Sequence, residues 1–386
     1  MIQAVLGRQR SALAACYFFY FAVLGLLVPY LGVFLTDLGF DALAIGQLMA
    51  ILFATRIIAP NLWAYLADRF GHRVRFVQIG ALMALLLFAF TLEVTSFEQM
   101  ALVLFGYTFC WNGILPQLEV VTLRSLGKDS HLYSVLRSFG SLGFIALVLG
   151  AGWWFESHGN SALPWFGVSL FALLTFASIW LREPDVDKPL QAPSSDFFRT
   201  LTSKPVLLFL LACALIQASH SPYYTFFVLY LRQLGIGESV AGMMISAGVV
   251  AEIVVFALMP KLITRFGIAK LMVFTAIITA MRWGLTVLVG ANELLQLGVQ
   301  LLHGISFGLG HGCAIQYVYR QFSPEDQGKA QAFYASIAFG LGGASGAWLA
   351  GISWQHSPTF TWWGAAIAAS LAALMLAAFS RCRAAS

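Results

Sequence analysis

The chain has 386 residues, of which 60% are hydrophobic and only 10% are charged, and its mean hydropathy is +0.81. A soluble globular protein carries about a quarter charged residues, so this composition excludes a soluble fold of this size. The formal net charge of +5 fits either a polyanion-binding protein or a membrane protein, and the positions of the charges decide between them.

Apolar segments of roughly 20 residues, each long enough to cross a hydrocarbon core of about 30 Å, follow one another along the chain. Most of the 22 Lys and Arg lie in connections on one side of this pattern, so the positive-inside rule places both termini in the cytoplasm. We expect an all-α, multi-pass protein of a bacterial-type inner membrane, with no nucleic-acid partner. Its twelve predicted spans are approximately 12–36, 43–65, 74–94, 98–123, 131–155, 160–181, 205–231, 239–262, 268–290, 294–319, 327–351 and 359–380.

The sequence repeats itself after 196 residues: FLTDLGFDALAIG (34–46) aligns with YLRQLGIGESVAG (230–242), and the Arg-Phe-Gly of 69–71 with that of 265–267. Six spans precede the repeat and six follow, which predicts two pseudo-symmetric six-helix bundles around a midplane site. We expect an N-terminal bundle at 1–181, a cytoplasmic linker at 182–204 and a C-terminal bundle at 205–386. The linker is polar and proline-rich, and its Phe197-Phe198 pair is expected at the membrane surface.

Arg56 lies near the middle of the second predicted span. Away from the ends of the spans, the count is three arginines against two glutamates, so this set carries one more cation than anion before any histidine is protonated. A planar guanidinium is suited to a carboxylate, so a small organic anion would supply the missing negative charge. The alternative is that Arg56 pairs with a loop acid or a backbone carbonyl.

Glu119 and Arg137 lie on neighbouring spans, and Asn112 shares the helical face of Glu119. The acid–base pair either binds a polar substrate or fixes the packing of two helices as a salt bridge. Both interpretations stay open. In the seventh span, His220 and Tyr224 share a face with Gln217 beside Pro222, and we expect them to line a cavity.

The densest set of ionisable side chains inside apolar runs is Glu252, Arg282, His303 and His311, on the eighth, ninth and tenth spans. Such groups usually face a protein interior or a water-filled cavity, and they mark substrate or proton paths. A carboxylate beside an arginine stays ionised, and it takes up a proton once the arginine moves away. We therefore predict that these four residues couple proton movement to transport. The alternative is a static ion pair with hydrogen-bonded core histidines.

Sequence patterns that are typical of enzymes are either absent or lie in predicted secondary structure that does not fit them. GISFG at 304–308 imitates a nucleophile elbow, but it lies inside a predicted helix without a preceding strand. The sequence has no GxxxxGK[ST] loop and no HExxH pair, and its five cysteines show no metal or disulfide spacing. We expect no enzyme activity, no cofactor and no metal.

AYLADRFGHR (64–73) resembles the Gly-x-x-x-Asp-Arg-x-Gly-Arg loop of the major facilitator superfamily. Further stretches, YSVLRSFGSLGF (133–144), SHSPYYTFFVLYL (219–231) and LLHGISFGLGHG (301–312), resemble the phenylpropionate-permease-like group, relatives of lactose permease. Ala64 stands where glycine is usual, and the second copy of the loop has Pro260 and Thr264 where Gly and Asp are usual. A charged gate is therefore expected only in the N-terminal half.

The resemblance implies transport by alternating access. It implies a cytoplasmic gate made by Asp68, Arg69, Gly71 and Arg73. It also suggests proton coupling by Glu252, Arg282 and His303, and substrate binding by the Glu119–Arg137 pair.

The sequence thus predicts a monomeric, proton-coupled symporter of a small organic anion, such as the aromatic carboxylate phenylpropionate. Its substrate-binding residues would be Arg56, Asn112, Glu119, Arg137, His220 and Tyr224. The alternatives are transport of a neutral sugar or nucleoside, export of drug-like compounds and, from another class, a membrane sensor that transports nothing.

Overall fold

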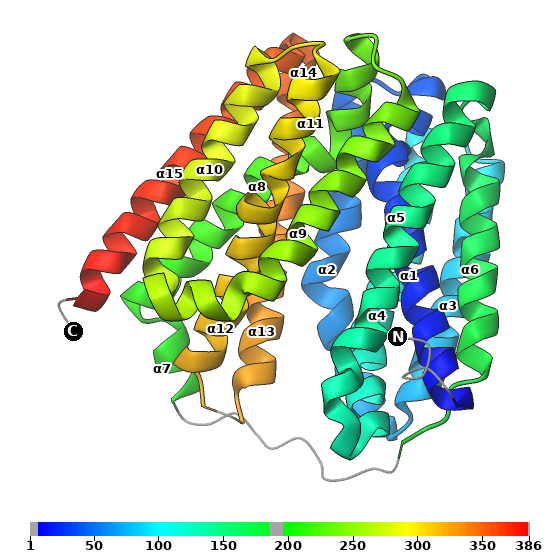
Figure 1. Ribbon diagram of the computed structural model, residues 1–386. Coiled ribbons are helices and arrows are strands. Elements are labelled where there is room, and N and C mark those ends of the chain that lie inside the picture. Colours follow the sequence, from blue (N-terminus) through cyan, green and yellow to red (C-terminus); the bar gives the residue numbers. More distant parts are fainter. Residues whose placement is uncertain (1–6, 185–195, 324, 385–386) are drawn as a thin grey trace. The chain divides into compact units, whose positions relative to one another are not determined.

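The computed structural model describes residues 7–184, 196–323 and 325–384, and these residues form helices and turns without a strand. Part of the predicted linker, 185–195, lies outside the described residues. The first half of the chain contains α1 (Arg8–Asp37), α2 (Ala42–Phe70), α3 (Arg73–Ala89), α4 (Phe97–Leu126), α5 (Tyr133–His158) and α6 (Leu163–Ile179) (Figure 1). Each of them coincides with one predicted span.

The second half contains two helical rods that are interrupted near their middle by a π-helical segment. The tenth predicted span is α11, η5 and α12, and the eleventh is α13, η6 and α14. The prediction of twelve spanning helices is confirmed, and the interruptions are the feature that it missed. The elements are α7 (Phe197–Leu201), α8 (Lys204–Gln233), α9 (Glu238–Phe266), α10 (Ile268–Leu288), α11 (Glu293–Leu301), η5 (Gly304–Leu309), α12 (Gly310–Gln321), α13 (Gln327–Ala335), η6 (Ser336–Gly342), α14 (Gly343–His356) and α15 (Pro358–Ala384).

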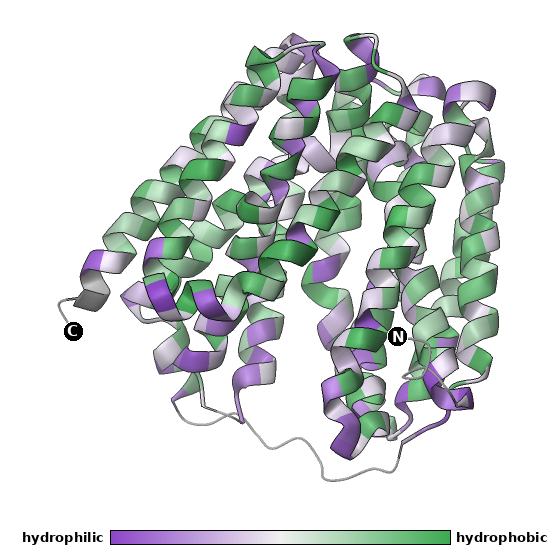
Figure 2. Cartoon of the chain, viewed as in Figure 1, coloured by the Kyte–Doolittle hydropathy of each residue, from purple (hydrophilic) through white to green (hydrophobic). Residues whose placement is uncertain are grey.

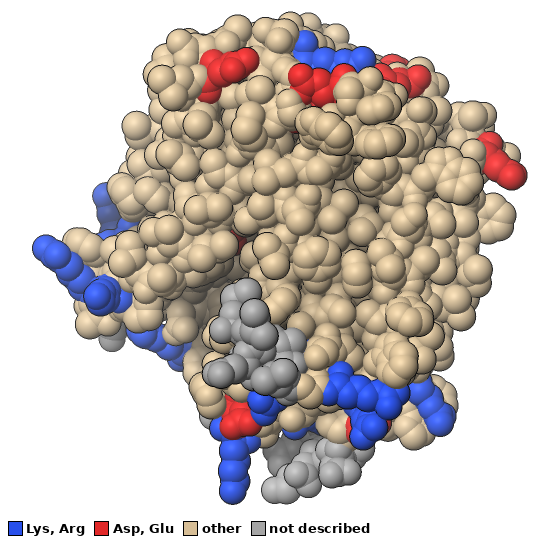
Figure 3. Space-filling model, turned by 45° about the vertical axis from the view of Figure 1, so that its right-hand side comes forward, with Lys and Arg blue, Asp and Glu red and all other residues tan. Residues whose placement is uncertain are grey.

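Apolar residues cover the middle of the helices, and polar residues gather at their ends (Figure 2). Among the described residues, ten continuous helical stretches are long and apolar enough to cross a membrane, one of which, Phe97–His158, contains both α4 and α5. On the face shown in Figure 3, Lys, Arg, Asp and Glu side chains gather near helix ends, and residues of other kinds make up nearly all of the surface between them. This distribution is the one that a hydrocarbon core requires.

The predicted internal repeat is present in the backbone. Both ends of α8 and of α9 lie 196 residues after the corresponding ends of α1 and α2. The bends repeat as well, because Gly39 and Gly235 have φ of 91° and 80°, and Gly71 and Gly267 have φ of 71° and 77°. Glycine adopts this left-handed conformation without the steric cost that other residues meet. The two halves therefore begin with the same pair of helices and the same two turns.

The contacts divide the described residues into two compact units. The N-terminal unit holds the described residues up to Phe40 and those from Thr55 to 184, and in it α1 packs on α5 and α6 while α3 packs on α4 and α6. The C-terminal unit holds Asp41–Ala54 and the described residues from Asp196 onward, and in it α8 and α10 pack on α15 while η5 packs on α9 and α10. This division cuts α2, which the predicted boundaries kept whole.

The short helix α7 occupies part of the predicted linker. Phe197 is buried in the apolar core of the C-terminal unit, against the ring of Phe322, whereas Phe198 is exposed. Only the second phenylalanine of the pair is thus available to a membrane surface.

Candidate functional site

Arg282, on α10, is fully buried and forms the centre of a polar cluster in the C-terminal unit. Its Nη1 donates to Nδ1 of His303 at 2.9 Å and to Oγ of Ser306 at 3.1 Å, and its Nη2 donates to Oε1 of Gln300 at 2.7 Å. The rings of Tyr223 and Trp283 lie 4.4 and 4.5 Å from its Cζ. Three hydrogen bonds to neutral groups and two aromatic faces thus hold this charge in the interior.

His303 connects Arg282 to Glu252. Because a guanidinium can only donate, Nδ1 of His303 accepts, and the proton of the neutral ring is on Nε2. That Nε2 lies 3.8 Å from Oε2 of Glu252, and the His303 and Glu252 side chains are 6% and 18% exposed. We predicted the carboxylate beside the arginine, and the structure places an imidazole between them. A second proton on His303 would remove the acceptor of the bond from Arg282.

Two glycines allow α9 to come this close to η5. A Cβ on Gly304 would lie 2.7 Å from the carbonyl of Ala251, and one on Gly308 would lie 2.8 Å from Cγ of Glu252. Real Cβ atoms do not make such contacts, so only glycine permits this approach. The glycines that the sequence contains in this segment are therefore part of what positions Glu252.

His220, on α8, is completely buried against the same cluster. Its Nδ1 donates to the carbonyl of Ile216 at 2.8 Å, and its Nε2, also buried, has no hydrogen-bond partner among the described residues. Its ring centroid lies 5.0 Å from that of Trp283 and 6.2 Å from that of His303. Tyr224, predicted on the same face, is half-buried with its ring 6.2 Å from that of His220.

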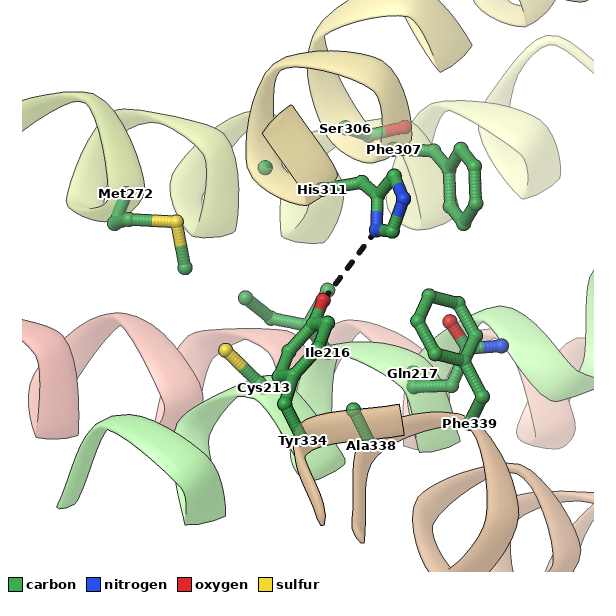
Figure 4. Close-up of a pocket in the computed structure, with 11 residues that line it drawn as sticks. Cys213, Ile216, Gln217, Met272, Ser306, Phe307, His311, Tyr334, Ala338 and Phe339 are labelled. Carbon is green, nitrogen blue, oxygen red and sulfur yellow. Dashed lines mark hydrogen bonds between the residues drawn. The ribbon is translucent and has the colours of Figure 1, made fainter. Parts of the chain in front are cut away.

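His311 lies on α12, two turns beyond His303. The ring of Phe307 lies between the two histidines, 5.2 Å and 5.8 Å from them and nearly parallel to both. Tyr334 approaches from α13, with its hydroxyl 3.5 Å from Nδ1 of His311 (Figure 4). All four ionisable residues predicted for proton coupling therefore lie in one unit, and three of them form a line from Arg282 through His303 to the carboxylate.

A small cavity lies between His311 and α8 (Figure 4). Its volume is about 30 Å³, enough for about one water molecule. The polar groups on its wall come from Gln217, Ser306, His311 and Tyr334. In this conformation the cavity is too small for an organic substrate.

In the N-terminal unit, Nε of Arg137 lies 3.7 Å from Oε1 of Glu119, and both side chains are about one third exposed. The guanidinium of Arg137 lies over the ring of Phe21, 4.0 Å from its centroid. The predicted facing pair is thus present, and its partial exposure leaves both charges accessible.

Arg56 is half-buried at the middle of α2. It lies within electrostatic reach of Tyr20, as do Glu119 and Arg137. Two cations and one anion therefore gather around the Tyr20 side of this unit, with a formal net charge of +1.

Asn112 is buried in a chain of hydrogen bonds between α2 and α4. Its Nδ2 donates to Oγ1 of Thr55 at 2.9 Å, Thr55 donates to Thr108 at 3.0 Å, and Thr108 donates to the carbonyl of Leu104 at 2.6 Å. These bonds hold the two helices together, so Asn112 has a packing role. Its contact with a substrate stays a prediction.

The charged loop between α2 and α3 is built around Arg73. Its guanidinium pairs with Asp68, and Nη1 donates to Oε1 of Gln117 at 2.5 Å. The carboxylate of Glu183 accepts the backbone N–H of Arg73 and of Val74, both at 2.8 Å, at the start of α3. The loop thus ties α2, α3, α4 and the segment after α6.

The other two residues of the predicted gate are placed differently. Gly71 ends α2 in the left-handed conformation, and Arg69 is exposed. In the second copy of this loop, the hydroxyl of Thr264 donates to the carbonyl of Pro260 at 2.8 Å, in place of an acid–arginine pair.

Sequence reasoning missed Gln300 and Ser306, which lie three residues before and three after His303. This spacing puts the three polar side chains on one helical face inside an apolar run, a signal that was available. Gln117 and Glu183 were also missed. No spacing rule connects Glu183 to a helix start that is 110 residues earlier in the chain.

The sequence profile of the MFS_1 like family matches residues 11–365. The maltose permease of Geobacillus stearothermophilus is 27% identical, over 86% of this chain and 85% of the relative. The probable 3-phenylpropionic acid transporter of Escherichia coli is 26% identical, over 92% of this chain and 94% of the relative. A crystal structure of a mutant of the nucleoside transporter NupG superposes with a TM-score of 0.85 at 20% identity, covering 97% of this chain and 99% of that one.

The solved structure shares the fold, and the match of the family profile covers nearly the whole chain. Its relatives are transporters, which agrees with the prediction of a transporter rather than an enzyme. The chain belongs to the MFS_1 like family of the major facilitator superfamily and is a multi-pass membrane transporter.

Proposed function

We propose that this transporter imports a small organic anion, an aromatic carboxylate, together with protons. The observation that supports coupling is the line Arg282–His303–Glu252, in which a neutral imidazole links a buried cation to a carboxylate. A change in the protonation of Glu252 or His303 therefore alters the hydrogen bond that holds Arg282. A line of this kind inside a membrane protein is suited to moving protons.

The first step is protonation on the Glu252 side. A proton that reaches His303 converts the ring into an imidazolium, which donates from both nitrogens and no longer accepts from Arg282. The imidazolium is attracted to Glu252 and repels Arg282, so the bond between Arg282 and His303 breaks. Loss of the proton restores the bond. Glu252 carries the proton in this scheme, His303 passes it on, and Arg282 responds to it.

The substrate carboxylate binds in the N-terminal unit. Arg56 and Arg137 bring two guanidinium groups to the Tyr20 side of this unit, and a guanidinium is suited to a carboxylate. Bidentate arginine contacts give orientation as well as attraction. The relative described as a probable 3-phenylpropionic acid transporter supports an aromatic acid as the substrate.

The Asp68–Arg73 loop serves as the gate on the cytoplasmic side of an inner membrane, where both termini lie. Its partners come from elsewhere in the same unit, because Gln117 lies on α4 and Glu183 lies in the segment after α6. Opening of this gate would break these hydrogen bonds. An inside-negative membrane potential contributes about 2.3 kcal/mol per 100 mV for each net positive charge that enters, so it drives uptake when more protons than substrate charges enter together.

The test is uptake by the purified protein in sealed vesicles with an alkaline interior. We expect labelled 3-phenylpropionate to accumulate above its outside concentration, the vesicle interior to acidify as substrate enters, and a protonophore to abolish both. Accumulation that persists with the protonophore would contradict proton coupling.

Maltose and a nucleoside are assayed in parallel, because relatives and a structural neighbour are described as transporting them. Gradient-driven uptake of either, without uptake of the carboxylate, would replace the anion with a neutral solute.

A further inference from the structure

His220 presents a buried acceptor that the proposed function does not use. Its Nδ1 is committed to the carbonyl of Ile216, which places the ring proton on Nδ1 and the lone pair on Nε2. That Nε2 is buried and has no partner among the described residues, and the whole residue is 0% exposed. An unmatched buried acceptor costs about 1–3 kcal/mol, so its retention in this place needs a reason.

The His220 ring lies beside two residues that Arg282 contacts. The His220 ring lies 5.0 Å from that of Trp283 and 6.2 Å from that of His303, and Arg282 touches both of these residues. Arg282 also acts electrostatically on His220. The two imidazoles are thus neighbours, and the guanidinium is hydrogen-bonded to one of them.

The His303 and His220 rings differ in whether they keep an acceptor nitrogen for Arg282 when a proton arrives. His303 accepts from Arg282 only while it is neutral, and it faces Glu252, from which a proton arrives. His220 faces Trp283, Tyr224 and Phe307, which carry no charge, so its Nε2 stays an acceptor. The titratable and charged groups facing Arg282 are His220, Tyr223 and Tyr224 on α8, Glu252 on α9 through His303, and His303 itself.

We propose that His220 is the second resting place of Arg282: when His303 becomes protonated, the guanidinium transfers its hydrogen bond from Nδ1 of His303 to Nε2 of His220. The inference rests on the proposed proton coupling and adds the receiving group that the coupling requires. It assigns His220 a positioning role toward Arg282, in place of the substrate contact predicted from its helical face.

The transfer explains why a fully buried arginine can be released without a large penalty. A displaced guanidinium would otherwise lose a charged hydrogen bond of about 1.5–3 kcal/mol. Its bonds to Gln300 and Ser306 already use their acceptors. Nε2 of His220 is a buried acceptor without a hydrogen-bond partner among the described residues, and its ring lies beside two residues that Arg282 contacts.

The direct measurement is nitrogen NMR of the intact protein in lipid nanodiscs, with ¹⁵N-labelled histidine. The seven histidines are few enough to assign His220 and His303 from the spectra of His220→Phe and His303→Gln. On acidification we expect His303 to change from a neutral ring to an imidazolium. Over the same pH range, Nε2 of His220 should move from the resonance of a free acceptor to that of a hydrogen-bonded one. In Arg282→Met the second change should disappear.

Protonation of His303 without a change at His220 would overturn the proposal, as would a change at His220 that persists in Arg282→Met. A His303 that stays neutral throughout would overturn it too. None of these readouts depends on a substrate. The proposed function is judged separately by gradient-driven accumulation, so the two can fail independently.

A pair of variants gives the functional counterpart. His220→Phe keeps a flat ring but removes the acceptor, whereas His220→Gln keeps an acceptor oxygen near the place of Nε2. We expect gradient-driven accumulation to fall about tenfold in His220→Phe, the equivalent of about 1.4 kcal/mol, and to recover most of that loss in His220→Gln. Exchange of preloaded substrate should stay close to wild type in both. Equal accumulation by the two variants would contradict the role of the acceptor.

Discussion

At the scale of single residues, the informative feature is the tautomer of His303. The sequence places an acid, an arginine and two histidines within the apolar runs of neighbouring helices. Their importance was predictable because an ionisable side chain inside a membrane costs free energy and is retained mainly for function. The order in which they touch was not predictable, because it depends on how each helix is rotated about its axis. The hydrogen bond from Arg282 settles that order and makes His303 the link to Glu252.

The first residue to test is Glu252. We expect Glu252→Gln to abolish accumulation against a gradient while exchange of preloaded substrate continues, because the amide keeps the shape of the side chain but cannot carry a proton. Counterflow and gradient-driven uptake, measured on the same vesicles, distinguish the two. Glu293→Gln makes the same change at an exposed position at the start of α11 and should behave as wild type. Wild-type accumulation by Glu252→Gln would show that the carrier is another residue.

Arg282 tests whether the cluster also supports the fold. Arg282→Lys keeps the charge but replaces a planar fork by a compact ammonium, which cannot reach His303, Ser306 and Gln300 together. Losing one charged hydrogen bond should lower the free energy of unfolding by about 1.5–3 kcal/mol, measured by denaturation in detergent. Arg320→Lys, at an exposed helix end, is the control. Equal stability of the two variants would contradict the role of the fork.

At the scale of elements, the C-terminal unit differs from a bundle of regular helices in its two π-helical segments. η5 carries Ser306 and Phe307, and η6 carries Ala338 and Phe339, and all four line the same small cavity. Short π segments inside helices are frequent at functional sites. No periodicity in the sequence indicates where a helix widens by one residue.

Gly308 tests how closely α9 and η5 must approach. In Gly308→Ala the new Cβ would lie 2.8 Å from Cγ of Glu252, so the carboxylate or the helix has to move. We expect gradient-driven uptake to fall and the free energy of unfolding to drop by about 1–3 kcal/mol. Gly298→Ala is a matched control on α11, because its Cβ would meet nothing within 4 Å. That variant should be unchanged or about 0.5–1 kcal/mol more stable. Equal effects of the two alanines would rule out the close approach as the cause.

At the scale of the whole molecule, composition and the twelve apolar runs predicted the fold class and the place of every spanning helix. The repeat predicted the two halves from a few glycines. Long apolar segments leave little freedom, because each must satisfy its own backbone as a helix. What the sequence could not supply is the attachment of Asp41–Ala54, the first part of α2, to the C-terminal unit. That depends on packing between residues hundreds of positions apart, such as Gly46 against Gly351.

The predicted orientation in the membrane can be tested with a thiol reagent that does not cross it. The four native cysteines with described side chains are buried, so the background variant needs Cys382→Ser alone. In intact cells we expect the reagent to label Glu93→Cys and Glu293→Cys, which follow α3 and α10. His72→Cys and Glu325→Cys should react only after permeabilisation. The reverse pattern would invert the topology.

The repeated hairpin carries a consequence for how such a transporter diversifies. α1 and α2 return as α8 and α9 with the same lengths and the same bends, yet Arg56 in the first copy corresponds to Glu252 in the second. The two copies of the hairpin have thus kept the same backbone, while one interior position is positive in the first copy and negative in the second. A repeat of this kind allows one half to specialise in substrate binding and the other in proton transfer without a change of fold.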